Sequence, residues 1–470
     1  MQNNVDILQE YVPVKTKVNF SLGSLANSFL NGFVFANITF FYQIKLGLAA
    51  NLLGIGWLIF AVWNTLNDPI ASYLIDNTRT KIGRRIPYIR YGSFLYGLAF
   101  IFCWFPIAPL DNQLLLFINF LAALFFLDTM FTFVGACYFS LPNEIAITAK
   151  ERASISVYNA VASFANLVLG IILPILLFTG YEGIPPFFGP AIIIIGIVCS
   201  ITLFITSFYI KENMFAQMQP HEGFFEGLKL TLKNKPFWIL AIPLFCIYLV
   251  LPIFSTGFLY YIEFVVADQV IIFFIVSFLT GIVLGMIVTI FVMPKWHPKK
   301  TSFINLIIVS IGSALLFFVG RNAILAAIPF FFIGVGFSGG MVALPVVLGD
   351  TIDNDELITG KRREAIYGGV NALVNKPAIS LANWMFLLTL SFFRFDANKQ
   401  VQTDVAILGI LVAICAIPAI LIGLSAIILK LFYPLDGPEW RKKKESIMEL
   451  HQKKERAYIQ KLKNEGKIKI

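Results

Sequence analysis

The sequence predicts an all-α membrane protein with twelve transmembrane helices in two six-helix bundles, from its composition, its apolar segments and the placement of its basic residues. Of 470 residues, 58% are hydrophobic and only 13% are charged, and the mean hydropathy is +0.79. A soluble domain of this length has too little polar surface to cover so many apolar side chains. The class of soluble globular proteins is therefore excluded.

Twelve apolar segments reach the roughly twenty residues that a helix needs to cross a bilayer. They cover about 20–45, 49–76, 88–110, 113–147, 153–179, 185–210, 237–266, 269–293, 302–319, 323–352, 365–393 and 405–433. This pattern predicts a short segment at 1–19, a six-helix bundle at 20–210, a linker at 211–236 with an amphipathic helix near 224–232, a second bundle at 237–433, and a basic, solvated tail at 434–470. The segments after the fourth and tenth spans resemble each other, which favours two related halves.

The basic residues predict the orientation. Thirty-one of the 36 Lys and Arg lie in the even-numbered connections or at the two ends of the chain. By the positive-inside rule, both ends are then cytoplasmic. The formal net charge of +9 is therefore a sign of membrane topology and not of nucleic-acid binding. The polar, partly acidic first residues do not form a cleavable signal sequence, so the first span is expected to stay in the protein.

A polar patch interrupts the second span. Asp68 lies at membrane depth, where a carboxylate costs at least about 2.5 kcal/mol and is a functional candidate. Asn64 shares its helix face, Asn67 lies beside it, and Pro69 removes a backbone donor in the next position. We expect these oxygen-rich groups to form an ion-coupling site.

Other kinds of chemistry lack their motifs. The five cysteines lie in apolar segments, and the three histidines are scattered, so no disulfide framework or metal centre is expected. No phosphate-binding loop or nucleophile–base pair is present, which argues against an enzyme or an ATP-driven pump. We expect no cofactor, a small-molecule substrate, the lipid bilayer as the only other partner, and a monomer in the cell membrane.

Four motifs together carry a family resemblance. They are NDP at 67–69, IDNTRTKIGRRIP at 75–87, GFFEGLKLTLKNKPF at 223–237 and GDTIDNDELITGKRREA at 349–365. The chain resembles the major facilitator superfamily, and within it the glycoside–pentoside–hexuronide:cation symporters such as the melibiose carriers. This resemblance implies two six-helix bundles and cation-coupled symport of a sugar, glycoside or similar small organic solute by alternating access.

The resemblance also implies an ion site with one change. Asn67, Asp68 and Thr132 match the family's cation ligands, but Asn64 stands where the family has a second carboxylate. Asp128, four residues before Thr132, either supplies the missing charge or pairs within the bundle. A single carboxylate favours H⁺ as the coupling ion, because Na⁺ loses affinity as ligand charge falls; Asp128 keeps Na⁺ open.

The solute site departs further from the family. Ser28 and Gly135 occupy the positions of its sugar-binding acids, and Phe139 occupies that of its tryptophan. Lys376 is retained, and either binds the solute, pairs with Asp68 or Asp128, or neutralises a buried charge. The remaining polar candidates are the neighbouring amides Asn31, Asn159 and Asn371, with Asn27 and Asn375 beside them. Simple galactosides are therefore poor candidates for the substrate.

Charged residues near the cytoplasmic ends of the spans predict a gate. In the first half these are Asp76, Arg84, Arg85, Glu144 and Arg152; in the second they are Asp350, Asp353, Arg362 and Arg363. Ion pairs that form and break at one face bias two states of similar energy.

Several other functions stay open. A carrier of amphipathic substrates such as lysolipids and an uncoupled facilitator belong to the same class. A membrane enzyme or a non-transporting sensor would belong to another class, but the sequence has neither a catalytic constellation nor an appended folded domain.

Overall fold

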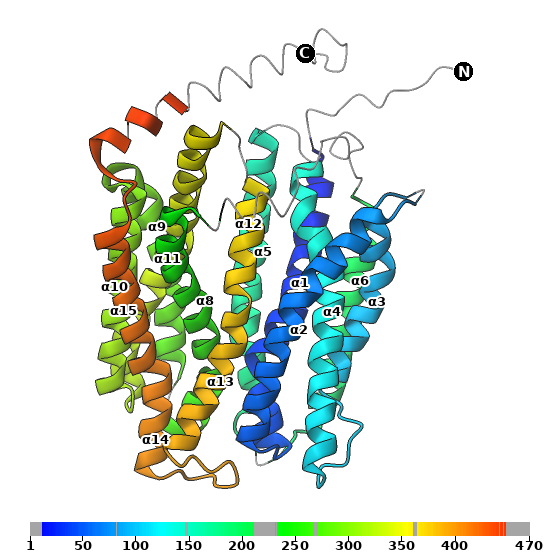
Figure 1. The fold of residues 1–470 in the computed structure, drawn as a ribbon. Helices are drawn as coiled ribbons and strands as arrows, with labels where there is room; N and C mark the ends of the chain where they lie inside the picture. The colour runs from blue at the N-terminus through cyan, green and yellow to red at the C-terminus, as the bar shows by residue number, and fades with distance from the viewer. Residues whose placement is uncertain are drawn as a thin grey trace.

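The computed structural model describes residues 12–80, 82–145, 149–181, 183–210, 231, 233–266, 271–360, 364–440, 442–444 and 446–447. Within these ranges the regular structure is helical (Figure 1). The first half holds α1 (Val14–Phe40), α2 (Ala50–Asn77), α3 (Ile86–Phe102), α4 (Gln113–Ile145), α5 (Ala149–Phe178) and α6 (Phe188–Thr206). The second half holds α8 (Lys235–Tyr261), α9 (Ile272–Trp296), α10 (Pro298–Val319), α11 (Ala323–Thr359), α12 (Glu364–Asn375), α13 (Pro377–Phe392), α14 (Asp404–Leu411) and α15 (Ile417–Phe432).

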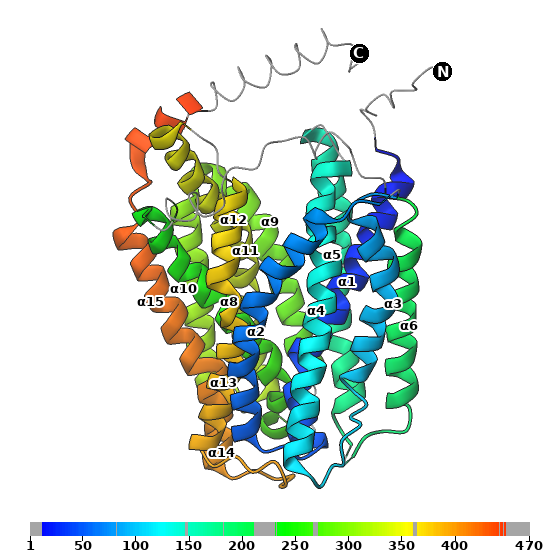
Figure 2. The same ribbon diagram turned by 45° about the vertical axis from the view of Figure 1, so that its right-hand side comes forward.

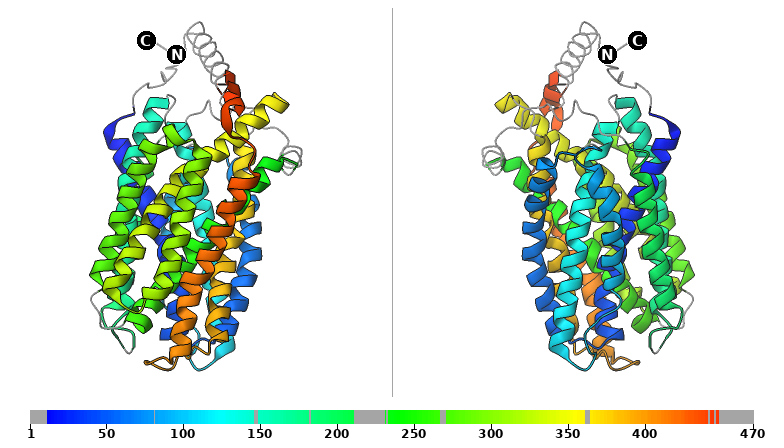
Figure 3. Two further views of the ribbon diagram at one scale, coloured as in Figure 1. Left: turned by 90° about the vertical axis from the view of Figure 1, so that its left-hand side faces the viewer. Right: turned by 90° about the vertical axis from the view of Figure 1, so that its right-hand side faces the viewer.

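The two halves stand side by side with their helices roughly upright. We call the end where α1 begins and α15 finishes the upper end, as in Figure 1. Figure 3 shows α10 and α15 on one outer side of the molecule and α3, α4 and α6 on the other. The halves meet where α2 packs on α13 and where α1 packs on α8. In Figure 2 the ribbons of the two halves spread apart toward the upper end.

Eight described helices are long and apolar enough to cross a membrane: Gln113–Phe139, Ala153–Phe178, Phe188–Thr206, Lys235–Val266, Ile272–Trp296, Pro298–Val319, Ala323–Thr359 and Asp404–Phe432. The remaining predicted spans correspond to α1, α2, α3 and the pair α12–α13. Large apolar side chains cover much of the outer surface, as expected where lipid rather than water surrounds a protein. Examples with at least 60% exposure are Val62, Ile107, Leu114, Phe291, Phe318, Ile324, Phe392 and Ile420.

The eleventh predicted span is not one continuous helix. It divides into α12 and α13 at Lys376, directly before Pro377. Proline lacks a backbone N–H and its ring clashes with the preceding turn, so it favours a helix start over a helix interior. The break places the only basic residue of this segment at the junction of two helices.

The described part of the segment after the last span, residues 434–440, 442–444 and 446–447, is partly buried, whereas the sequence predicts a solvated tail. Leu435, Trp440 and Ile447 are each at most 8% exposed and belong to the hydrophobic core. Apolar side chains at these positions gain by packing on the helices rather than facing water. The predicted amphipathic helix at 224–232 lies, except for Thr231, outside the described residues.

Candidate functional site

An ion pair joins the two halves at the polar patch of α2. Lys376 Nζ pairs with Oδ1 of Asp68 and donates a hydrogen bond to the backbone oxygen of Asn64 at 3.1 Å. The Asp68 side chain is 38% exposed and that of Lys376 is 22% exposed. The helix break at Pro377 and the patch on α2 thus meet at one partly solvated point.

A second carboxylate lies against the same patch. The side-chain nitrogen of Asn67 donates to Oδ2 of Asp128 and to Oγ1 of Thr132, each at 3.0 Å. All three residues are at most 5% exposed. Because Asp128 and Thr132 stand four residues apart on α4, both face α2 across the same contact. The structure therefore brings together the five residues that the sequence singles out for ion coupling.

The group carries one more negative charge than positive. Asp68 and Asp128 are acids, Lys376 is the single base among these residues, and Asp128 lies within electrostatic reach of both others. Trp63 stacks on Phe125 beside the patch, with ring centroids 4.8 Å apart and an interplanar angle of 10°. A site with an excess negative charge, next to stacked aromatic rings, attracts a small cation.

The residues predicted to hold the solute lie on four helices: Ser28 and Asn31 on α1, Gly135 and Phe139 on α4, Asn159 on α5, and Asn371 on α12. Asn371 accepts a hydrogen bond from Asn375 at 2.9 Å. Phe139 is 71% exposed and meets Phe131 edge to face. The buried amide oxygens of Asn31 and Asn159 have no hydrogen-bond partner in the described part of the chain. Within the described part of the chain, no hydrogen bond or ion pair links these residues to Lys376.

A neutral contact between the halves was missed by the sequence analysis. At the lower end, Oδ1 of Asn383 on α13 accepts hydrogen bonds from Thr39 on α1 and Thr256 on α8, both at 2.9 Å. Trp57 donates to the same Thr39 hydroxyl at 2.9 Å, and all four residues are fully buried. Nearby, Tyr260 donates to Gln43 at 2.5 Å. The available signal was a set of isolated polar residues inside apolar spans.

One of the charged residues predicted for the gate, Asp350, is paired within its own half. Asp350 is 1% exposed and pairs with Lys444, which follows α15 in the same half. Arg362 and Arg363 lie outside the described residues, as do the side chains of Asp76, Glu144 and Arg152. Arg84, Arg85 and Asp353 belong to the described residues, and Arg84 is 8% exposed. The pairing between halves thus remains a prediction.

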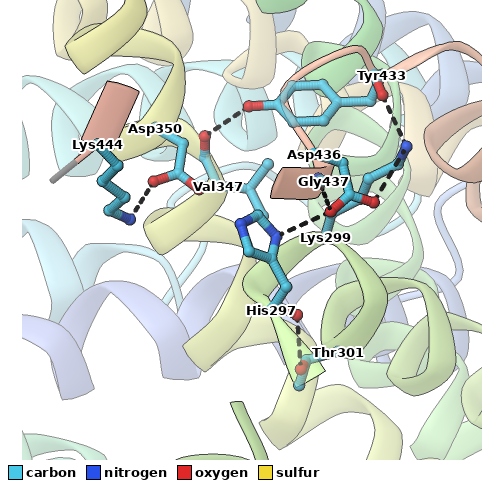
Figure 4. A network of polar contacts seen from close by, with 9 residues as sticks. All are labelled: His297, Lys299, Thr301, Val347, Asp350, Tyr433, Asp436, Gly437 and Lys444. Atoms are coloured by element: carbon cyan, nitrogen blue, oxygen red, sulfur yellow. Dashed lines mark hydrogen bonds and ion pairs between the residues drawn. The ribbon is translucent and has the colours of Figure 1, made fainter. Parts of the chain in front are cut away.

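Figure 4 shows how the segment after α15 is held at the upper end. Tyr433 donates to the backbone oxygen of Val347 at 3.0 Å, and Lys299 donates to the backbone oxygen of Tyr433 at 2.7 Å. Asp436 faces His297 and Lys299, with N–O distances of 3.4 and 3.7 Å. These contacts tie the segment to α10 and α11.

Comparison with known proteins agrees with this architecture. A family model described as MFS/sugar transport protein matches residues 19–437. The inner membrane symporter YicJ of Escherichia coli (strain K12) is 24% identical over 436 residues, covering 91% of this chain and 93% of the relative. The isoprimeverose transporter of Lactiplantibacillus pentosus is 22% identical over 445 residues, covering 92% and 91%. The crystal structure of a bacterial homologue of the human lysosomal transporter Spinster aligns with a TM-score of 0.62 at 12% identity, over 88% of this chain and 97% of that one, and shows the fold alone.

Proposed function

Because the chain belongs to the MFS/sugar transport protein family, and is thus a membrane transporter and not an enzyme, we propose that it performs cation-coupled symport of a sugar, glycoside or similar small organic solute. The observation that carries this proposal is the ion pair between Asp68 and Lys376. It joins one half to the other where Asp128, Asn67 and Thr132 also meet. A charged contact between two moving halves lets ion binding bias their arrangement.

The membrane arrangement forms part of the proposal. We propose twelve spans, with α12 and α13 together making the eleventh, and both ends of the chain in the cytoplasm. The distribution of the 36 Lys and Arg supports this orientation, since the positive-inside rule places basic connections in the cytoplasm. The upper end in Figure 1 is then the cytoplasmic end.

The names of the relatives support the solute class. A symporter and an isoprimeverose transporter are among them, and each aligns along nearly its whole length. Sugars and glycosides need polar partners in a pocket, and Ser28, Asn31, Asn159, Asn371 and Lys376 are the candidates for that role. Asp68, Asn64, Asn67, Thr132 and Asp128 are the candidates for the coupling ion, which is H⁺ or Na⁺.

Uptake into vesicles tests the proposal. Purified protein is reconstituted, and isoprimeverose and a panel of glycosides are offered under an inward H⁺ or Na⁺ gradient. We expect the wild type to concentrate at least one of them and Asp68→Asn to lose uphill accumulation while keeping some exchange. The matched control is Asp404→Asn, because Asp404 is 84% exposed and pairs with Arg321 away from the site.

The result also separates the alternatives. Accumulation that persists in Asp68→Asn would refute the coupling role. Equilibration without concentration under either gradient would indicate an uncoupled facilitator. Uptake that follows Na⁺ at fixed pH, and loses that dependence in Asp128→Asn, would replace the preference for H⁺ with a two-carboxylate sodium site.

A further inference from the structure

We propose that Lys376 is a built-in competitor of the coupling ion: it occupies Asp68 when the ion is absent, and ion binding releases its ammonium to donate hydrogen bonds to the solute. This inference rests on the proposed function and assigns the regulation of the same site. The ion-free state then has a defined contact of its own, the pair between Asp68 and Lys376.

The partners of Lys376 are the kind that a cation selects. Its Nζ contacts a carboxylate oxygen of Asp68 and the backbone oxygen of Asn64. Small hard cations are held in proteins by carboxylate and carbonyl oxygens. The ammonium therefore sits among ligands that suit the coupling ion, and the two cannot use the same oxygens together.

The neighbouring groups make this exchange possible. The second acid, Asp128, is held by Asn67 through a hydrogen bond of 3.0 Å and is 2% exposed. Because the three charged groups sum to one negative charge, one additional monovalent cation brings the group to neutrality. The arriving ion then compensates Asp68 in place of Lys376 when the ammonium turns away.

Lys376 is also placed to move. It lies at the junction of α12 and α13, where Pro377 interrupts the helix, and its side chain is 22% exposed. A lysine has four rotatable bonds and three donors, so it can turn from one oxygen to another. A solute that accepts a hydrogen bond from the released ammonium binds better when the ion is present, and by linkage the ion binds better when the solute is present. The coupling of ion and solute binding then follows because the Lys376 ammonium cannot pair with Asp68 and bind the solute at the same time.

Ion affinity in variants of Lys376 tests the proposal without transport. The purified protein is titrated with Na⁺ at fixed pH and, separately, with H⁺, while thermal stability and the infrared signal of ionised carboxylates are followed. Lys376→Gln removes the competitor, so the half-saturating ion concentration should fall at least about tenfold, the smallest effect expected of an opposite charge in contact. Lys376→Arg should raise it, because a guanidinium grips a carboxylate with two hydrogen bonds. Lys430→Gln on α15 is the matched control and should change nothing.

A labelling experiment distinguishes displacement from simple charge repulsion. The reactivity of the Lys376 amine toward a succinimidyl ester is measured by mass spectrometry at constant pH, with Lys430 as the internal standard. Asp68→Asn imitates the neutralised carboxylate, so labelling of Lys376 should increase at least about threefold; Asp128→Asn should leave it near the wild-type rate. The labelling experiment requires that Asp68→Asn folds. It therefore tests the proposal even if Lys376→Gln fails to fold.

The outcomes are separable from those of the uptake assay. Unchanged or weaker ion binding in Lys376→Gln, an affinity in Lys376→Arg equal to that of the wild type, or unchanged labelling of Lys376 in Asp68→Asn would each overturn the competitor role, even if symport is established. If neither ion binds the wild type, Lys376→Gln should reveal binding, and failure to do so overturns the inference as well. Lack of gradient-driven uptake, by contrast, counts against the proposed function alone.

Discussion

The two contacts that join the halves differ in chemistry. The lower contact consists of neutral hydroxyl, amide and indole groups around Asn383, and all of them are fully buried. The upper contact is the ion pair of Asp68 and Lys376, in which both side chains keep part of their exposure to solvent. The neutral contact around Asn383 contains no charged group that an ion could replace. The Asp68–Lys376 pair contains a carboxylate that a cation can bind.

This difference indicates a division of roles. A neutral hydrogen bond contributes about 0.5–1.5 kcal/mol and does not depend on pH or salt when its partners cannot ionise. In a charged pair, a cation that binds the carboxylate weakens the attraction between the carboxylate and its basic partner. Within the proposed function, the Asn383 contact would close the lower end, and Asp68 and Lys376 would respond to the coupling ion.

The strongest way to break the comparison is to charge the neutral contact. Asn383→Asp places a carboxylate where two donors and a fully buried surface now accommodate a neutral amide. We expect a loss of about 3–5 kcal/mol in the free energy of unfolding, the cost of an uncompensated buried charge. The loss should shrink at low pH, where the carboxyl group is neutral. Thermal unfolding in detergent across a pH series measures it. Asn51→Asp, at an exposed helix start, is the control; an equal loss there would contradict the argument.

A smaller effect is expected from a charged contact that lies within one half. Lys444→Ala leaves Asp350, which is 1% exposed, without its ion-pair partner. Stability should fall by about 1–3 kcal/mol, the cost of leaving a buried polar group unsatisfied. Ion affinity at Asp68 should stay unchanged, because this pair does not join the halves. Lys443→Ala, an exposed neighbour, serves as the control. A change in ion dependence would show that the segment after α15 acts on the coupling site.

Removing one hydroxyl from the lower contact should have a still smaller effect. Tyr260→Phe deletes the hydrogen bond to Gln43 and keeps the ring in its aromatic packing against Phe40. We expect about 1 kcal/mol, seen as increased labelling of a cysteine introduced at the neighbouring Ile44, which leaves Gln43 in place. Tyr248→Phe, on the same helix and 40% exposed, should leave this labelling unchanged. Labelling that decreases would mean that the contact does not close this end.

The smallest effect should come from a solvated ion pair between the start of α14 and the turn before α11. Arg321 and Asp404 are 54% and 84% exposed and pair at 2.8 Å. Arg321→Ala should change the unfolding free energy by about 0–1 kcal/mol, because water screens exposed charges. A larger change would indicate that charge alone, without burial, controls the stability of this protein, and would remove the basis of the comparison.

Much of the architecture could be predicted from the sequence, because bilayer-length apolar segments are a strong signal. The predicted fourth span at 113–147 corresponds to α4, and the predicted tenth at 323–352 begins where α11 begins. The division of the eleventh span at Pro377 was missed. A proline inside an apolar segment is compatible with either a kinked helix or two separate helices, so the sequence alone did not decide between them.

The ion patch and the solute site were predictable to different degrees. Helical spacing places Asn64 and Asp68 on one face of α2, and Asp128 and Thr132 on one face of α4, so periodicity alone groups each pair. Which helices meet is a tertiary fact, and the partner of Lys376 was left open among several groups for that reason. The burial of Leu435 and Trp440 after the last span was also missed, because the eleven basic residues of the tail dominate its composition.

In the alternating access proposed above, the acceptance of two hydrogen bonds by Asn383 has a consequence for the rate of opening. When the halves separate at the lower end, its oxygen and the two threonine hydroxyls must each find water, and each can do so because all three are ordinary neutral hydrogen-bonding groups. No ion has to be stripped from or returned to this surface. The barrier is then set by the unpacking of aromatic side chains that meet across the halves, such as Phe40 and Tyr260, and the closure can be undone and remade on the microsecond-to-millisecond timescale of domain motions.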